Sequence, residues 1–122
     1  MNDFNRALQT SKALGDGNRL KIMAALLQHE ELCACQITEF LEIAGATASR
    51  HLSILSNAGL VECRKEGRWM HYRLSIADDL LRAWLVNSLN GTDLGRLAQI
   101  MATNPEDICR KQRGNGCCPA KE

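Results

Sequence analysis

The sequence lacks any apolar run long enough to cross a membrane. Its longest apolar runs, such as residues 22–27, fall far short of the roughly 20 consecutive residues that a membrane-spanning helix needs. Residues 1–6 also lack the basic head followed by an apolar stretch that marks a secretory signal. We therefore expect a cytoplasmic protein with no membrane partner.

The sequence also lacks the motifs of common enzyme classes. It has no Cys-x-x-Cys pair, no Gly-rich phosphate loop and no nucleophile elbow, so we do not expect an enzyme. The net charge is only +1, so any attraction to nucleic acid must be local. Such local charge exists, because residues 50–73 carry five Arg or Lys against two acids, whereas residues 30–42 carry four acids and no Arg or Lys.

The spacing of apolar residues predicts a mainly helical chain. We expect a first helix over residues 3–14 and a second helix capped by Asp16. Late helices are predicted to begin at Asp78 or Asp79, at a Thr92 cap, and at the Asn104-Pro105 pair. The apolar faces of the late helices exceed what a small core requires, so part of them is expected to form a dimer seam.

Between these helices lies the pattern of a winged helix-turn-helix. Two short helices, residues 35–42 and 46–57, flank a turn over residues 43–45 that contains Gly45. Residues 60–65 and 69–74 show strand character and are joined by a tight connection at Gly67. The predicted fold is mainly α with a small β-hairpin, with a DNA-binding and dimerisation domain over residues 1–103 and a cysteine-containing tail over residues 104–122.

Polar side chains of the second short helix and basic side chains of the hairpin are the candidates for DNA contact. The candidates at the front of the helix are Thr47, Ser49, Arg50 and His51. Lys65 and Arg68 on the hairpin are expected to contact phosphates. Two alternatives remain open: Ser49 and His51 could instead hydrogen-bond within the turn, and the charged hairpin could be only a solvated surface.

Several stretches of the chain resemble the ArsR/SmtB family of metal-responsive transcriptional repressors. They are Leu14-Gly15-Asp16 with Arg19-Leu20, Glu31-Leu32-Cys33-Ala34-Cys35, Ser49-Arg50-His51-Leu52 with Leu55, Ala58-Gly59-Leu60-Val61, and Arg64-Lys65-Glu66-Gly67-Arg68-Trp69 with Tyr72-Arg73-Leu74. The resemblance implies a winged-helix homodimer that binds double-stranded operator DNA without effector and is released when metal binds. The box at Cys33 and Cys35 resembles that of arsenic, antimony, cadmium and lead sensors.

The chain departs from the family in four ways. No third cysteine follows the box within residues 36–38, and no cysteine precedes Cys33. The Asp and His pairs of the zinc-sensing type are absent from the late helices. Residues 44–46 are less polar than the usual entry to the reading helix. A zinc site between the late helices is therefore not expected.

Cys33 and Cys35 supply two soft ligands at a helix start, where unpaired amides and the helix dipole lower a thiol pKa. Trivalent arsenic or antimony, as arsenite or antimonite, is matched by three sulfurs, and Cd(II) or Pb(II) is the alternative inducer. Alternatively, the two cysteines are only small buried residues and do not bind an ion. The candidate metal ligands are Cys33, Cys35, Cys109, Cys117 and Cys118.

Two arrangements of these sulfurs are open. Cys117 or Cys118 from either subunit could complete the Cys33 and Cys35 site, or the three tail cysteines could form a complete site of their own. Cys63 is interpreted as a structural strand residue. A thiol-redox-responsive repressor and a metal-buffering protein without DNA function also remain open.

Overall fold

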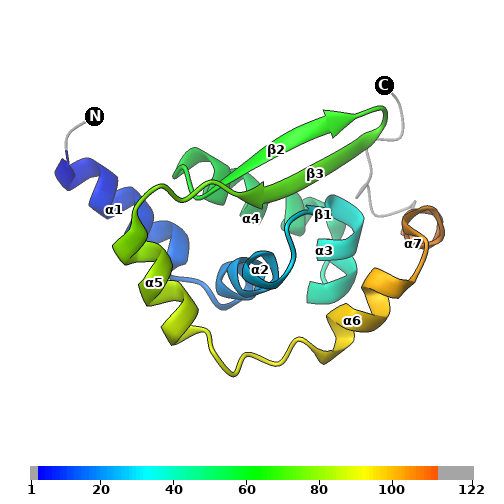
Figure 1. The fold of residues 1–122 in the computed structure, drawn as a ribbon. Helices are drawn as coiled ribbons and strands as arrows, with labels where there is room; N and C mark the ends of the chain where they lie inside the picture. Colours follow the sequence, from blue (N-terminus) through cyan, green and yellow to red (C-terminus); the bar gives the residue numbers. More distant parts are fainter. Residues whose placement is uncertain (1–2, 113–122) are drawn as a thin grey trace.

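Residues 3–112 are the part of the chain that the structure, a computed structural model, describes (Figure 1). Their elements are, in order, α1 (Asp3–Leu14), α2 (Gly17–Gln28), β1 (Leu32–Cys33), α3 (Ala34–Leu41), α4 (Gly45–Asn57), β2 (Val61–Glu66), β3 (Trp69–Leu74), α5 (Asp79–Ser88), α6 (Gly95–Ala102) and α7 (Pro105–Lys111). Among these helices, none combines the length and the apolar character that crossing a membrane requires.

The predicted helix-turn-helix is confirmed as α3 and α4. The turn itself differs from the prediction, because α4 already begins at Gly45 and the left-handed residue is Glu42, with φ 57°. This strained conformation ends α3 and is held by an ion pair of 2.9 Å between the Glu42 carboxylate and Arg96 of α6. The entry to α4 is therefore shaped by a contact from a distant helix.

The predicted wing is confirmed as an antiparallel β2–β3 hairpin. Its register runs from Val61 opposite Leu74 to Glu66 opposite Trp69, and Gly67 at φ 63° makes the turn. The sequence did not predict a third strand. β1 pairs with β3 on the side away from β2, with Cys33 opposite His71. This pairing ties the cysteine box to the wing.

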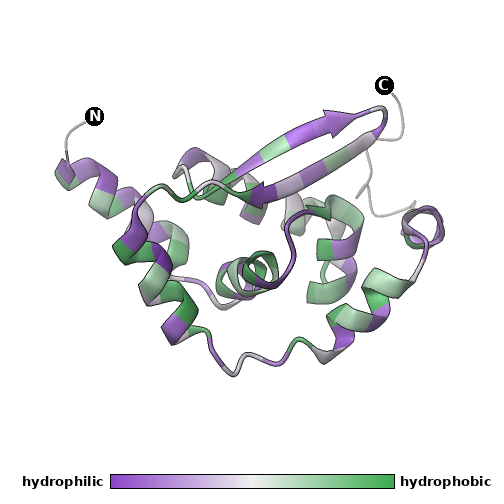
Figure 2. Cartoon of the chain, viewed as in Figure 1, coloured by the Kyte–Doolittle hydropathy of each residue, from purple (hydrophilic) through white to green (hydrophobic). Residues whose placement is uncertain are grey.

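The core lies around α2, between α4, α5 and the sheet. Ile22 and Met23 of α2 are fully buried, and they belong to one apolar cluster with Leu55 and Leu85. Figure 2 shows the hydrophobic colour concentrated in α2 and α3 and the hydrophilic colour along much of the β2–β3 hairpin. The hairpin is thus a mostly polar element, and the apolar core that supports it lies around α2.

The late helices match the prediction at two of three starts. Asp78 caps α5, and Asn104 with Pro105 opens α7, as predicted. The predicted Thr92 cap is wrong, because α6 begins only at Gly95. The Thr92 hydroxyl instead donates to the Leu89 carbonyl across 2.7 Å, so it closes the end of α5 rather than opening α6.

The described part of the predicted tail packs into the domain. Ile108 of α7 is 5% exposed and joins the same apolar cluster as the core. The packed domain therefore continues past residue 103, the boundary predicted from the sequence, as far as residue 112. The amphipathic turn of α7 has too few residues for its periodicity to be read in the sequence.

Candidate nucleic-acid interface and thiol pair

One side of α4 is exposed and polar. Thr47, Ser49 and Arg50 all lie on the surface of this helix, whereas Ala48 and Leu52 are buried beneath it. The exposed strip continues one turn further to Ser53, which was not among the predicted contacts. Its spacing of four residues from Ser49 could have indicated it, because such residues share a helix face. The strip offers hydroxyls and one guanidinium to a partner.

His51 lies inside the protein rather than on this strip. Its side chain is 8% exposed, and its Nδ1 atom lies 3.0 Å from Nη1 of Arg19 and 3.9 Å from the Asp16 carboxylate. The predicted groove contact by His51 therefore does not match the position of its side chain. Its hydrogen bond is made with Arg19 of α2. The bond is internal, as in the alternative that we left open, but it lies outside the turn.

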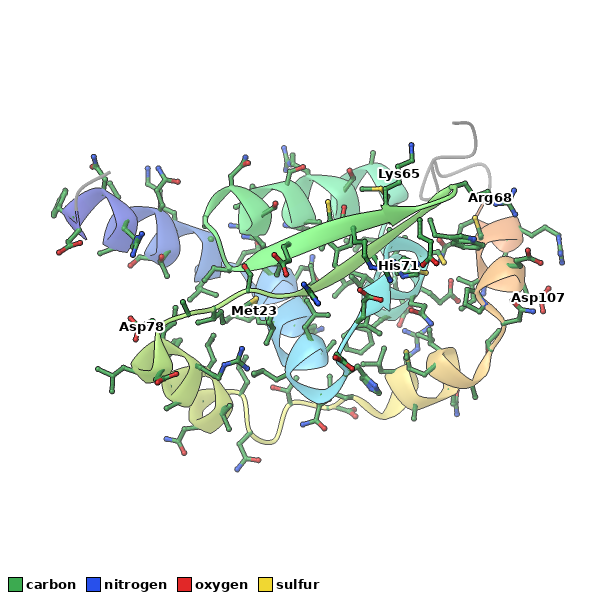
Figure 3. All side chains as sticks on the ribbon, turned by 45° about the horizontal axis from the view of Figure 1, so that its top comes forward. Met23, Lys65, Arg68, His71, Asp78 and Asp107 are labelled. Carbon is green, nitrogen blue, oxygen red and sulfur yellow. The ribbon has the colours of Figure 1, made fainter. Side chains whose placement is uncertain are left out.

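Two predicted wing residues are exposed close to the hairpin turn. Lys65 extends away from the hairpin and Arg68 lies at its tip (Figure 3). The Arg68 guanidinium carbon lies 5.5 Å from the centre of the Trp69 ring, a cation–π contact that restricts the arginine. Both positively charged side chains are therefore exposed at the surface, where they can contact an extended polyanion.

The other two basic residues of the hairpin are occupied by carboxylates. Arg64 pairs with Glu31 across 2.7 Å and with Glu66 across 2.9 Å. Arg73 pairs with Glu62 across 2.6 Å. These pairs neutralise the charges of Arg64 and Arg73 locally.

Cys33 and Cys35 form a buried thiol pair at the start of α3. Their sulfurs lie 2.9 Å apart, with side chains 3% and 0% exposed. Cys33 is the N-cap of α3, and its backbone N–H donates to the Gln36 side chain across 2.9 Å. The structure thus brings together the two sulfurs that the sequence predicted as ligands.

The environment of the pair favours one thiolate. The hydrogen bond from the Cys35 thiol, followed by the backbone N–H groups of Gln36 and Cys35, lowers the pKa of Cys33 from 9.0 to about 7. Burial opposes this shift, because it disfavours the charged form. The lowered pKa favours the thiolate of Cys33, which is the form that binds soft ions.

Helix α7 lies against the same pair. The Cys35 sulfur lies 3.7 Å from the Pro105 carbonyl oxygen, so the single thiol proton of Cys35 can bond either to this oxygen or to Cys33. At the other end of α7, the Gln112 amide donates to the Cys35 carbonyl across 3.2 Å and to Glu39 across 2.8 Å. Lys111 adds an ion pair of 2.6 Å to Glu39. The hydrogen bonds from Lys111 and from Gln112 lower the pKa of the Glu39 carboxyl.

The remaining cysteines are distributed more widely. Cys63 is free and exposed on β2, and Cys109 is half-buried on α7 and disulfide-bonded. Cys117 and Cys118 lie outside the described residues. Within residues 3–112, no group of three or more His, Cys, Asp or Glu side chains is placed to hold a metal ion. The described thiol pair therefore offers two sulfurs in this conformation.

Comparison with known proteins gives a consistent result. The model of the bacterial regulatory proteins of the arsR family matches residues 16–62. The chain is 39% identical over 82 residues to an uncharacterized HTH-type transcriptional regulator of Methanocaldococcus jannaschii, a match that covers 67% of this chain and 90% of that protein. Two further relatives are named for metal resistance.

The arsenical resistance operon repressor of Escherichia coli is 43% identical over 72 residues, covering 59% of this chain and 62% of that protein. A homologue of the cadmium resistance regulatory protein CadC from Staphylococcus aureus is 44% identical over 63 residues, covering 52% of each chain. The chain thus spans between half and two thirds of the length of these two relatives.

Two solved structures share the fold. HlyU from Vibrio cholerae superimposes with a TM-score of 0.63 at 30% identity, covering 73% of this chain and 95% of that chain. A homodimeric winged helix-turn-helix DNA-binding domain from Mycobacterium bovis, a possible ArsR-family regulator, gives 0.62 at 29% identity, covering 76% and 92%. Both likenesses extend over most of the described elements.

Proposed function

Because this chain belongs to the arsR family of bacterial regulatory proteins, we propose that it is a transcriptional repressor whose dimer leaves operator DNA when a soft metal or metalloid ion binds its thiols. The family and the fold are those of DNA-binding transcriptional regulators, not of enzymes. What we propose is that the protein responds to an ion, which ion this is, and which residues bind it.

One observation carries the proposal: the buried pair of Cys33 and Cys35 lies at the start of the first helix of the helix-turn-helix, with its sulfurs 2.9 Å apart. Only the short turn at Glu42 separates α3 from α4. An ion that draws these sulfurs into its coordination shell must move the first turn of α3. Since α3 packs on α4, this movement changes how α4 is presented to DNA.

The DNA contacts follow from exposure and charge. Thr47, Ser49 and Arg50 on α4 enter the major groove, and Ser53 extends that contact by one turn. Lys65 and Arg68 on the wing bind phosphates, which gives affinity without reading sequence. His51 positions α4 from within, rather than contacting DNA.

The dimer follows from apolar surface that a single chain leaves uncovered. Phe4 of α1 is 74% exposed, and Leu80 and Trp84 of α5 are 83% and 53% exposed. α1 and α5 lie at the same end of the molecule (Figures 1 and 3). The related Mycobacterium bovis domain is a homodimer. Two copies present two α4 helices and two wings, so the operator is expected to be partly palindromic.

The chemistry of the donors favours a soft effector. Cys33 is poised near neutrality and thiolates select soft ions, so arsenite or antimonite is the preferred inducer and Cd(II) or Pb(II) the alternative. Three sulfurs suit a trivalent arsenical, and the chain has three candidates for the third: Cys109, Cys117 and Cys118. Reversing occupancy from almost all bound to almost all released takes about 5.5 kcal/mol of differential affinity.

The test uses a labelled DNA duplex that the effector-free protein selects from a random pool. Binding is followed by fluorescence anisotropy while arsenite, antimonite, Cd(II) and Pb(II) are added one at a time. We expect at least one ion to release the duplex from the wild type and not from the Cys33→Ser and Cys35→Ser variants. If both variants respond like the wild type, the thiol pair is not the sensor. If no ion releases the DNA, the ion response is wrong.

A thiol-redox repressor is the second candidate, because two buried sulfurs lie 2.9 Å apart and one has a lowered pKa. In that case hydrogen peroxide oxidises the two thiols to a disulfide and is itself reduced to two waters. Release of DNA by peroxide, reversed by a phosphine reductant, together with no response to the four ions, would select this candidate.

A further inference from the structure

We propose that Cys109 of α7 supplies the third sulfur to Cys33 and Cys35 of the same subunit. This inference rests on the proposed function and names the ligand that the function leaves open. It differs from both arrangements expected from the sequence, since neither combines the box pair with Cys109. The observations that carry it are the contacts that α7 makes with Cys35.

The first contact places one turn of α7 beside the Cys35 sulfur. That sulfur lies 3.7 Å from the Pro105 carbonyl oxygen. In an α-helix the carbonyl of one residue accepts the N–H of the fourth residue after it, so the Pro105 oxygen faces the backbone nitrogen of Cys109. The Cys35 sulfur is then at most about 7 Å from that nitrogen, which is within the reach of a cysteine side chain toward a shared ion.

The second contact lies on the other side of Cys109 along the helix. The Gln112 amide donates to the Cys35 carbonyl across 3.2 Å. Residues 105 and 112 of α7 thus both touch Cys35, and Cys109 lies between them in the chain. Helical spacing puts residues 105, 108, 109 and 112 on one face, and the burial of Ile108 and Gln112 confirms that this face meets α3.

Apolar packing and polar contacts both dock α7 on the domain. Ile108 is buried in the core, and Glu39 of α3 receives both the Gln112 amide and the Lys111 ammonium. Among residues 3–112, the buried Oε1 atom of Gln112 has no hydrogen-bond partner, so Gln112 is held on α3 by the hydrogen bonds of its amide N–H groups. A third ligand on this helix needs no second subunit.

Arsenite binds by ligand exchange, so the oxidation state of arsenic does not change. Arsenous acid, As(OH)3, exchanges its three hydroxyl groups for three cysteine thiols, which gives As(SR)3 and three waters. Cys109 is disulfide-bonded in the structure, so it joins the site only after that bond is reduced. Two cellular thiols can supply the two electrons by exchange and leave as a disulfide. In the test a phosphine supplies them and takes an oxygen atom from water to become its oxide.

The experiment compares two variants of the full chain, reduced with a phosphine because dithiols would compete for arsenite. One variant, Cys117→Ser with Cys118→Ser, keeps Cys33, Cys35 and Cys109. The other, Cys109→Ser, keeps the box pair and both distal cysteines. Cys63→Ser is the matched control, since Cys63 is exposed on the wing. Arsenite affinity is measured by calorimetry, and the sulfur neighbours of arsenic are counted by X-ray absorption.

We expect three sulfur neighbours and near wild-type affinity in the double variant and in the control. The Cys109→Ser variant should show two sulfur neighbours and bind roughly 100-fold more weakly, as when one arm of a multivalent contact is lost. Circular dichroism checks that each variant is folded, and Cys109→Ala repeats the test with a different side chain.

Other outcomes overturn the inference. If Cys109→Ser keeps three sulfurs and the double variant loses one, the third ligand is Cys117 or Cys118. If Cys33→Ser and Cys35→Ser leave three sulfurs, the site lies in the tail alone. If the wild type does not bind arsenite at all, the arsenite response of the proposed function fails together with this inference. A third ligand at Cys117 or Cys118 overturns only this inference, whereas a site in the tail alone also removes the thiol pair as the sensor.

Discussion

Arg19 of α2 donates a hydrogen bond from Nη1 to Nδ1 of His51 on α4 across 3.0 Å. The same guanidinium donates from Nε to the Ala13 carbonyl across 2.7 Å, so one side chain joins the end of α1 to the helix proposed to read DNA. Because an arginine guanidinium only donates, Nδ1 of His51 accepts in this hydrogen bond. Arg19 is thus a positioning residue for α4.

Replacing Arg19 tests this role. The Arg19→Ala variant loses its bonds to His51, Ala13 and Lys12, and we expect it to lower the free energy of unfolding by about 2 kcal/mol. Its affinity for DNA should fall further than instability alone explains, because α4 loses its alignment. Urea unfolding and anisotropy measure the two effects. Lys21→Ala, at an exposed position of the same helix, should change stability by less than about 0.5 kcal/mol. Unchanged DNA affinity in folded Arg19→Ala would contradict the role.

The lowered pKa of Cys33 predicts a titration near neutrality. Absorbance of the thiolate at short ultraviolet wavelengths should rise through about pH 7 by one group per chain. Cys35→Ala removes the thiol that donates to Cys33, so the pKa should move up toward its usual range. Cys63→Ala should leave the step near pH 7 unchanged. A step that persists unaltered in Cys35→Ala would show that the hydrogen bond is not its cause.

The same shift predicts how stability depends on pH. The pKa of Cys33 is lower in the folded protein than the ordinary value of 9.0, so ionisation favours the folded state. Its contribution to the free energy of unfolding is fully present above pH 9 and is lost as the pH falls through about 7. The difference in stability between wild type and Cys33→Ala should therefore grow from pH 6 to pH 9 in urea unfolding. A difference that shrinks over this range would have the wrong sign.

The wing predicts a salt effect without a change in sequence preference. Lys65→Ala and Arg68→Ala should each weaken DNA binding and lower the slope of log affinity against log salt by about 0.9, the value for one lost phosphate contact. Both should weaken all sequences alike. The control is the double variant Glu62→Gln with Arg73→Gln, which removes a neutralised pair and keeps the charge of the wing. If this control lowers the slope as much as Lys65→Ala, the assignment of phosphate contacts is wrong.

The exposed strip of α4, unlike the wing, is expected to determine the sequence preference of DNA binding. Arg50→Ala should reduce affinity for the selected duplex by about 10- to 100-fold, with a smaller loss on unrelated DNA, because a groove contact is worth about 1–3 kcal/mol of discrimination. Ser53→Ala should follow in the same direction with a smaller loss. Unfolding of both variants should match the wild type, since both side chains are exposed. An equal loss on every sequence would move Arg50 from base reading to phosphate binding.

The parts that the sequence could predict are those with a local signal. The Asp16 cap, the Asn104-Pro105 start and the Gly67 turn each depend on residues that are close together in the chain. They were predicted because capping and turn chemistry act over a few residues.

The parts that it missed depend on distant partners. β1 has only two residues, too few for a periodic pattern, and it exists because β3 offers it an edge. His51 is polar and was placed on the surface, yet Arg19 and Asp16 satisfy it in the interior. Cys109 gave no sign that α7 docks beside Cys35, because this contact spans about 70 residues.

The most direct test of the account is the affinity for the selected duplex with and without arsenite, measured side by side for the wild type and for Cys35→Ser under phosphine reduction. Cys35 is the residue that links the thiol pair, α3 and α7. The account predicts that saturating arsenite weakens the affinity of the wild type by at least about 100-fold, which corresponds to about 2.7 kcal/mol of coupling. It also predicts that Cys35→Ser binds the duplex as tightly as the wild type and no longer responds. Equal release of the variant and the wild type by arsenite would contradict it.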